Sequence, residues 1–261
     1  RWIDPGFRKD VGNPDLKKDR IWDPRSARAI VDKCTGKPAT VSETTKETSQ
    51  IAPQLYDLTS LQREANSRFG FSAKNTLGIA QALYERHKVL TYPRTDSRHL
   101  PEDYLKTSGS VVERHTNWQF GRYASIILKK GYIRPDKRVF NNSKVSDHHA
   151  IIPTTRLPSG LSEPEMKIYQ MVVQRFLAVF FPPARYLNTT RLSIVEQETF
   201  LSEGKILKEP GWKAVYLGNQ PEKGQGLLGA IPKGAAVVCT DVVEEKKETK
   251  PDKRTKKFLM P

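Results

Sequence analysis

The sequence contains very few cysteines. Only Cys34 and Cys239 carry thiols among 261 residues, and two cysteines so far apart have neither the spacing of a metal site nor that of a disulfide framework. Free thiols are typical of proteins from a reducing compartment. We therefore assign no function to either cysteine and expect a cytoplasmic protein.

Long apolar stretches are also missing. No run approaches the length that spans a bilayer, and residues 1–5 lack the apolar core of a signal peptide. The chain begins without a methionine, directly in an aromatic-rich stretch, which we interpret as a piece of a longer protein. No membrane partner is expected.

Acidic residues are too few to balance the basic ones. The formal net charge is +15, and residues 51–187 hold much of the excess, with 20 Lys and Arg against 11 Asp and Glu. This balance points to a polyanionic partner such as nucleic acid, or to an anionic surface. Charge alone does not distinguish a binding face from a solvated one.

Periodicity divides the chain into helical and extended segments. Helices are predicted over residues 24–34, 61–68, 73–87, 121–130 and 163–180, with another beginning at Pro101. Strands are predicted over 39–48, 186–194, 199–207, 212–217 and 235–243. The residues expected to cap or begin helices are Thr59 or Ser60, Ser72, Pro101 with Glu102 and Asp103, and Ser162 with Glu165.

These segments predict an α+β fold with a helical module between two β-rich flanks. The helices at 61–68 and 73–87, a glycine turn between them and the extended stretch 89–92 resemble a winged-helix unit. We expect residues 52–187 to form that module and residues 1–51 with 188–246 to pair as one discontinuous domain. Residues 247–261 read as a basic tail.

Two strings contain residues that could carry chemistry. In the first, residues 90–97 (LTYPRTDS), Tyr92 is followed by Pro93, which fixes the backbone, and by Arg94, which can hold a phosphate bidentately. A tyrosine in an extended segment is most often a packing residue. It can also act as a covalent nucleophile if its phenol is activated.

The second string, residues 146–154 (SDHHAIIPT), contains the pair His148 and His149. Adjacent histidines seldom chelate one metal ion, and no other Cys/His cluster completes a coordination sphere. A basic stretch precedes the pair. It includes Lys144 and can be read either as solvated charge or as a nucleic-acid contact.

Together, in this order, the two strings and the helix pair before them resemble the type IA DNA topoisomerases. The DHHAIIPT form is similar to the topoisomerase III branch, and residues 61–97 resemble the family continuously. The whole resemblance covers roughly residues 40–245. It implies a winged-helix-like (catabolite-activator-like) tyrosine domain inserted into a β-rich arch that opens the protein gate.

The resemblance also implies a reaction. Tyr92 attacks a backbone phosphate of single-stranded DNA, becomes linked to the 5′ phosphate and later reverses the step without ATP. Arg94 and His148 match the family residues that hold the scissile phosphate. The residues expected to contact DNA or shape the site are Thr91, Asp96, Ser97, Lys144 and His149.

Some of the family's machinery has no counterpart in the sequence. The Toprim domain, which binds Mg²⁺ through an acidic cluster, has no matching Asp-x-Asp here. We therefore expect no metal ligands in this chain, Mg²⁺ bound by the missing domain, and no relaxation activity from the chain alone. Single-stranded or negatively supercoiled DNA is the expected partner of a monomer at the nucleoid, and the resemblance allows a helicase as a second partner.

Three other interpretations remain open. A winged-helix DNA-binding module without chemistry shares the helix pair and the charge. A tyrosine recombinase also forms phosphotyrosine but needs a His-x-x-Arg upstream of its tyrosine, whereas Tyr92 precedes His148, and Ile151 stands at the matching step. A metal protein built on His148 and His149 lacks further ligands.

Overall fold

The computed structural model describes residues 1–9, 16–218, 228, 231 and 236–243. The predicted basic tail, 247–261, lies outside these residues, and so does Ala235 of the last predicted strand. The contacts divide the chain into two compact units. The strand unit comprises residues 1–46, 188–205 and 225–261, and the helical unit comprises residues 47–187 and 206–224.

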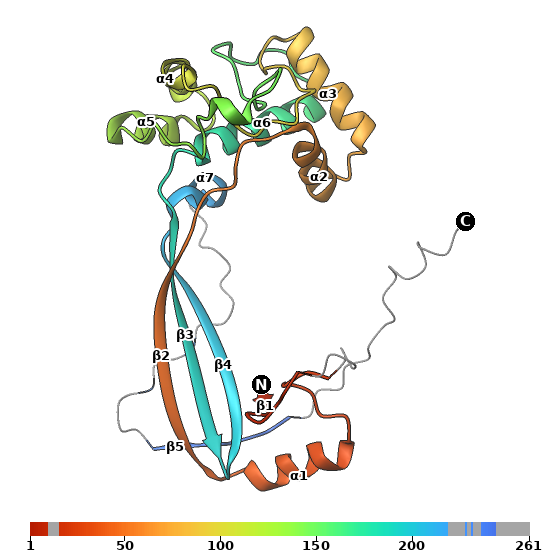
Figure 1. The fold of residues 1–261 in the computed structure, drawn as a ribbon, viewed down its shortest axis with the longest axis vertical. Helices are drawn as coiled ribbons and strands as arrows, with labels where there is room; N and C mark the ends of the chain where they lie inside the picture. The colour runs from red at the N-terminus through yellow and green to blue at the C-terminus, as the bar shows by residue number, and fades with distance from the viewer. Residues whose placement is uncertain (10–15, 219–227, 229–230, 232–235, 244–261) are drawn as a thin grey trace, which may run out of the picture. The chain divides into compact units, whose positions relative to one another are not determined.

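An α+β fold is confirmed, with a five-stranded sheet in the order β1-β4-β3-β2-β5. The strands are β1 (Trp2–Ile3), β2 (Pro38–Gln50), β3 (Ala184–Val195), β4 (Glu198–Glu209) and β5 (Val237–Val238). The short strands pair antiparallel with long ones, β1 with β4 and β5 with β2. Figure 1 shows β2, β3 and β4 side by side.

The turn between β3 and β4 sets the register of that hairpin. Glu196 and Gln197 both have positive φ, 47° and 70°, as a two-residue type I′ turn requires. On the same strand unit, Glu198 accepts hydrogen bonds from Trp2 Nε1 at 2.9 Å and from Lys33 Nζ at 2.8 Å. One carboxylate thus ties β1 and helix α1 (Pro24–Cys34) to the start of β4.

The remaining helices belong to the helical unit. They are α2 (Leu58–Phe69), α3 (Ala73–Glu85), α4 (Tyr104–Arg114), α5 (Gly121–Lys130), α6 (Glu163–Ala178) and α7 (Ala214–Leu217), with 3₁₀ turns η1 (His115–Asn117), η2 (Asn142–Lys144) and η3 (Gly211–Lys213). Helix α3 packs against α6 and α2, and α4 packs against α5. Figure 1 shows these helices gathered in one group.

The α6 helix forms the centre of the core. The apolar stripe predicted for it is confirmed, because every member is buried: Ile168, Met171, Val172, Phe176 and Val179. Its predicted capping box of Ser162 and Glu165 is also present. The helix ends at Ala178, two residues before the predicted end.

Two helix starts differ from the predictions. Helix α2 begins at Leu58 with Asp57 as its cap, because the Asp57 carboxylate accepts the Ser60 N–H at 2.7 Å; Thr59 and Ser60 lie inside the helix. Helix α4 begins at Tyr104, so Glu102 and Asp103 precede its first turn instead of occupying it. The predicted cap Ser72 is confirmed. The predicted glycine turn is also confirmed, since Gly70 ends α2 in the left-handed conformation with φ 70°.

The strand predicted at 212–217 is wrong, because these residues form η3 and α7. Trp212, Val215 and Tyr216 have the three- and four-residue spacing of a helix face. Gly211 starts the turn at φ 50°, and a β-carbon there would lie 2.4 Å from the Pro183 carbonyl oxygen. Only glycine allows this close approach.

Across the ranges that the structure describes, no helix is long and apolar enough to cross a membrane.

A buried carboxylate joins α3 to α6. Glu165 accepts hydrogen bonds from Ser162 and pairs with Arg86 and His87, which follow α3. Burial raises the pKa of its carboxyl, but the Ser162 hydrogen bonds and the charge of Arg86 outweigh burial and lower the pKa to about 2. The charged form therefore stabilises the fold above the unfolded-state pKa of about 4.3, and this contribution is lost as pH falls through about 2.

We expect Glu165→Gln to lower the free energy of unfolding by about 1–3 kcal/mol at pH 7, because it removes the negative charge that pairs with Arg86 and His87. The matched control is Glu163→Gln, whose side chain is 80% exposed beside Lys167, so the stability of this variant should stay close to that of the wild type. Urea denaturation measures both. The gap between wild type and Glu165→Gln should narrow from pH 5 toward pH 2, and a gap that does not change with pH contradicts the assignment.

Candidate active site around Tyr92

The segment that carries Tyr92 is held against the segment that carries the histidine pair. The Thr91 N–H donates to the Ile152 carbonyl at 3.0 Å, and the Thr154 N–H donates to the Val89 carbonyl at 3.0 Å. An isolated antiparallel bridge joins Leu90 to Pro153. The two sequence strings, far apart in the chain, therefore lie side by side in the helical unit.

A third segment completes this arrangement from the start of α2. The Ile151 N–H donates to the Tyr56 carbonyl at 2.8 Å, and the Leu58 N–H donates to the Thr95 carbonyl at 3.0 Å. Arg98 Nε donates to the Asp57 carboxylate at 2.8 Å. The Tyr92 segment is thus fixed along both of its neighbours.

Burial alternates along the Tyr92 segment. Tyr92 is partly exposed, and Arg94 and Asp96 are exposed, whereas Pro93, Thr95 and Ser97 are buried. This is the two-residue period of an extended chain, with successive side chains on opposite faces. The phenol, the guanidinium and one carboxylate consequently share the outer face.

Hydroxyl groups on the inner face bond the Tyr92 segment to the segment of the histidine pair. Thr91 Oγ1 donates to the Ala150 carbonyl at 3.2 Å and accepts the Ile152 N–H at 3.0 Å. Thr95 Oγ1 donates to the His148 carbonyl at 2.9 Å.

Ser97 Oγ donates to the Lys144 carbonyl at 2.8 Å. Of the residues predicted to contact DNA or shape the site, Thr91 and Ser97 therefore have their hydroxyls engaged within the protein.

Two rings flank Tyr92. The His148 ring lies 4.2 Å from the Tyr92 ring between centroids, and the Tyr84 ring meets it edge-on at 5.4 Å. Among the residues that the structure describes, no hydrogen-bond partner occupies the Tyr92 hydroxyl and none pairs with the exposed Arg94. The ring is held by packing while its hydroxyl remains available.

The two histidines face different neighbours. His148 contacts Tyr92, whereas His149 donates from Nδ1 to the Ala150 carbonyl at 2.8 Å and packs against Tyr104 at 4.5 Å. Burial lowers the pKa of His149, which favours its neutral form at pH 7. Within the described part of the chain, no three His, Cys, Asp or Glu side chains are grouped so that they could hold a metal ion.

Three residues next to the site were not predicted as members of it. Tyr84 stands in the last turn of α3, shortly before the Tyr92 segment. Lys88 has a positive φ of 56°, and its ammonium lies 5.6 Å from the Tyr84 ring centroid. Tyr104, whose ring packs against His149, could not be predicted from neighbouring residues because His149 is distant in sequence.

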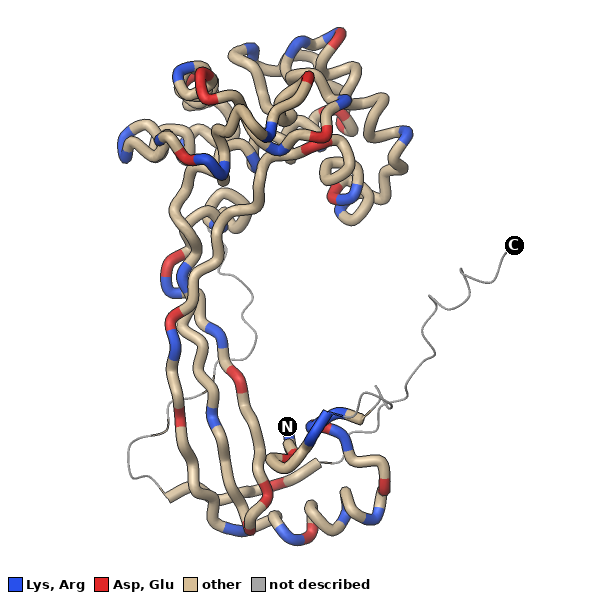
Figure 2. The backbone as a smooth tube through the Cα atoms, in the orientation of Figure 1, with Lys and Arg blue, Asp and Glu red and all other residues tan. Residues whose placement is uncertain are grey.

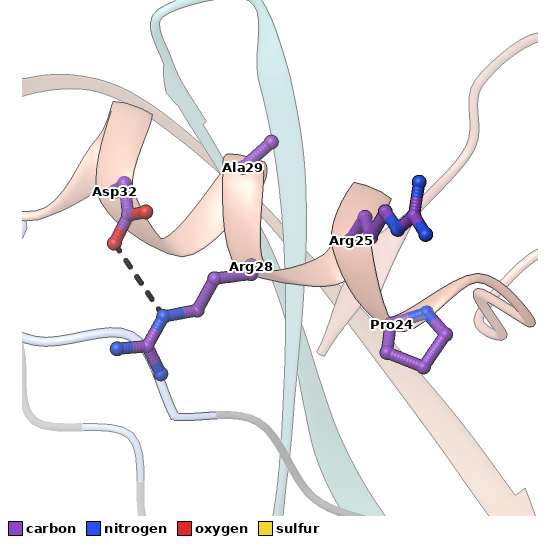
Figure 3. A pocket seen from close by; sticks show the side chains of 5 residues that line it. All are labelled: Pro24, Arg25, Arg28, Ala29 and Asp32. Atoms are coloured by element: carbon purple, nitrogen blue, oxygen red, sulfur yellow. Dashed lines mark ion pairs between the residues drawn. The ribbon is translucent and has the colours of Figure 1, made fainter.

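Neither the distribution of charged residues nor the position of a cavity is enough to locate the Tyr92 site. Figure 2 shows Lys and Arg spread over the helical unit with acidic residues among them. A hollow of about 510 Å³ lies along α1 in the strand unit, lined by Pro24, Arg25, Arg28, Ala29 and Asp32. In Figure 3 Arg28 reaches Asp32 at 3.8 Å while Arg25 points elsewhere, so these side chains form no converging set.

Comparison with known proteins identifies the class. The sequence model of the DNA topoisomerase family matches residues 5–258, so the chain belongs to the DNA topoisomerases, in the type IA class. Within that class it is topoisomerase III-like. DNA topoisomerase 3 of Bacillus licheniformis is 44% identical over 227 residues, covering 84% of this chain and 31% of the relative. DNA topoisomerase 3 of Bacillus subtilis is 41% identical over 246 residues, covering 91% of this chain and 34% of the relative.

The fold is similar to a solved structure of the same class. Full-length topoisomerase I from Thermotoga maritima matches with a TM-score of 0.57 at 22% sequence identity, covering 84% of this chain and 35% of that one. The chain spans about a third of the length of the curated relatives it matches.

We expect Thr95→Val to loosen the junction between the two strings, because valine keeps the shape but removes the hydrogen bonds to His148 and Ser97. The free energy of unfolding should fall by about 1–3 kcal/mol, and the Ser97 amide should exchange faster with solvent. The exposed Thr155 provides the control, since Thr155→Val should change stability by less than about 0.5 kcal/mol. If the two variants had the same free energy of unfolding and the same exchange rate at the Ser97 amide, Thr95 would not hold the two strings together.

Proposed function

We propose that this chain carries the cleavage and religation centre of a type IA DNA topoisomerase. The Tyr92 hydroxyl loses its proton and attacks a phosphorus of single-stranded DNA. The bond from that phosphorus to the 3′ oxygen breaks, and the 3′ oxygen takes up a proton. One phosphodiester is exchanged for another, so the reverse reaction reseals the strand without ATP.

The observation that carries the proposal is the contact between the Tyr92 and His148 rings at 4.2 Å. It brings the candidate nucleophile and a possible hydrogen-bond donor to one surface, although they come from separate strings. The partial exposure of Tyr92 and the unpaired hydroxyl, within the described residues, leave room for a phosphate.

Arg94 and His148 are proposed to hold the scissile phosphate. Both are exposed beside Tyr92, and fixed donors that face a charged transition state can each contribute about 10²- to 10³-fold in rate. Further DNA contacts are proposed for Lys144, Asp96 and His149. Thr91 and Ser97 are proposed to shape the loop, because their hydroxyls are bonded to the backbone.

The remaining assignments follow from the family. We propose that residues 52–187 form a winged-helix-like tyrosine domain and that residues 1–51 with 188–246 form a gate, of which residues 47–51 and 206–224 belong to the helical unit. Mg²⁺ would be held by a Toprim domain outside this chain, since the described residues offer no cluster for it. Single-stranded or negatively supercoiled DNA would be the substrate, a helicase could act beside it, and a nucleoid location would follow.

Covalent capture tests the nucleophile. The chain is mixed with a Toprim-containing fragment of a related topoisomerase, Mg²⁺ and single-stranded DNA labelled at its 3′ end, and labelled protein is sought on a denaturing gel. Tyr92→Phe should abolish the labelled band, because phenylalanine has no oxygen to form the ester. Arg94→Ala and His148→Ala should form the band about 10²- to 10³-fold more slowly.

The matched control for this assay is Tyr132→Phe. Tyr132 packs against Phe181 in the helical unit, so the variant loses one phenol hydroxyl without touching the site. A band that persists in Tyr92→Phe would assign the chemistry to another residue. Binding of DNA with no covalent band in any preparation that assembles would favour the module without chemistry.

We also expect the chain alone to leave supercoiled plasmid unrelaxed. Its described residues assemble no cluster for the Mg²⁺ ion that the family requires. Agarose electrophoresis of plasmid incubated with the chain and Mg²⁺ provides the measurement. Ladders of relaxed topoisomers that disappear with Tyr92→Phe would contradict this expectation.

A further inference from the structure

The turn between α3 and the Tyr92 segment contains a strained residue. Among the described residues of the helical unit, Lys88 is the one non-glycine residue with a positive φ, at 56°. The β-carbon of any residue other than glycine makes this left-handed conformation costly. Such strain persists only where the surrounding structure enforces it, and it is concentrated at functional sites.

Hydrogen bonds on both sides enforce this turn. The Lys88 carbonyl accepts the Thr154 hydroxyl at 2.8 Å. The next residue, Val89, donates its N–H to the Leu83 carbonyl at 2.9 Å and accepts the Thr154 N–H at 3.0 Å. The strained backbone is therefore held by α3 on one side and by the end of the second string on the other.

The Lys88 side chain lies beside the ring that contacts Tyr92. Its ammonium is 5.6 Å from the Tyr84 ring centroid, and the Tyr84 ring meets the Tyr92 ring edge-on at 5.4 Å. Lys88 is exposed, and among the described residues no carboxylate pairs with it. A cation–π contact at an exposed site contributes less free energy than a strained backbone costs, so the ring alone does not explain a lysine here.

Two arginines come to the same stretch of chain. Thr154 Oγ1, which donates to the Lys88 carbonyl, also accepts the Arg156 N–H at 3.2 Å. Arg114, in the last turn of α4, donates from Nε to the Thr155 carbonyl at 3.4 Å. Both arginines are exposed, and neither has a carboxylate partner within the part of the chain that the structure describes. We call Lys88, Arg114 and Arg156 the basic ridge.

The acidic residues close to the basic ridge in sequence or packing do not neutralise it. Glu165 is engaged by Arg86 and His87. Glu85 and Glu113 are exposed on α3 and α4, and in the described part of the chain neither pairs with a member of the ridge. Three cations without carboxylate partners thus stand next to the Tyr92 site, and such a group of cations attracts a polyanion.

We propose that the basic ridge holds backbone phosphates of the single strand that Tyr92 cleaves, with Lys88 on the phosphate nearest to the scissile one. An ammonium has three N–H donors, so Lys88 can bind a phosphate while it stays beside the Tyr84 ring, and no base has to displace it. Phosphate contacts fix the register of a strand without reading its sequence. The inference rests on the proposed function for the identity of that strand.

The salt dependence of DNA binding counts the phosphate contacts. Fluorescence anisotropy of labelled oligothymidylate is measured with the Tyr92→Phe chain, in which no covalent ester can form. Lys88→Gln, Arg114→Gln and Arg156→Gln should each reduce the slope of log affinity against log salt by about 0.7, the share of one phosphate contact on a single strand.

The matched control is Lys129→Gln, which removes an exposed charge on α5 and should leave the slope unchanged. A wild-type slope in Lys88→Gln, or in both arginine variants, overturns the proposal.

Two further substitutions of Lys88 separate its charge from its backbone. Lys88→Arg keeps the positive charge and should keep the wild-type slope. Lys88→Gly removes the charge but accepts a φ of 56° without strain. It should therefore lose the same share of the slope while its Tm does not fall. If Lys88→Gly bound DNA with the wild-type slope, the lysine would serve only the turn and the proposal would be wrong.

A duplex of the same length distinguishes the two forms of DNA, since both carry phosphates. A loss of slope confined to the duplex overturns the assignment to the cleaved strand. In covalent capture with the Toprim-containing fragment, the DNA concentration for half-maximal labelling should rise about 5-fold for Lys88→Gln at about 0.1 M salt. Unchanged slopes with capture by Tyr92 intact overturn only this inference, whereas altered slopes without capture overturn only the proposed function.

Discussion

The hydroxyl of Thr91 is the contact on which the candidate site depends. It bonds in both directions to a backbone that is 59 and 61 residues away in the sequence, at Ala150 and Ile152. Both of these residues are buried, so the hydrogen bonds are shielded from water, where an unmade bond is costly. Once these two hydrogen bonds are made, the register between the two strings is fixed.

The alternation of the extended chain places the side chains of the candidate site on one face. Hydroxyl groups of Thr91, Thr95 and Ser97 are used on the inner face, and the phenol and guanidinium of Tyr92 and Arg94 are left on the outer face. The Tyr92 side chain therefore needs no polar partner of its own to be oriented. Backbone pairing, the buried Pro93 and flanking rings position it instead, which is the kind of rigid support that precise sites require.

Local structure could be predicted where a local signal determines it. Ser72, Gly70 and the Ser162–Glu165 box mark helix ends through bonds to residues three or four positions away, and they act as predicted. Residues 212–217 were predicted as a strand because they are rich in β-branched and aromatic residues. The helix that they form has only four residues, which is too short to show a clear helical spacing. Asp57 was missed as a cap because Thr59 and Ser60, two and three residues further on, are also favoured capping residues.

The site itself could be predicted only in part. The importance of Tyr92 and His148 came from the resemblance of two strings to a family, since no periodicity joins residues so far apart. The different orientations of His148 and His149, and the participation of Tyr84, depend on packing between segments. The place of η3 and α7 could not be foreseen either, because residues 212–217 had been assigned to a strand.

The distance in sequence between the two strings has a consequence for the order in which the protein acquires its site. During synthesis Tyr92 emerges well before the histidine segment. Bringing the two strings together closes a long loop, and the entropy that this costs is offset only when the contacts between the strings form. A chain released before residue 148 would contain the tyrosine but not its neighbouring ring or its backbone pin. Tyr92 is thus synthesised early, and its surroundings form only when a much later segment of the chain packs against it.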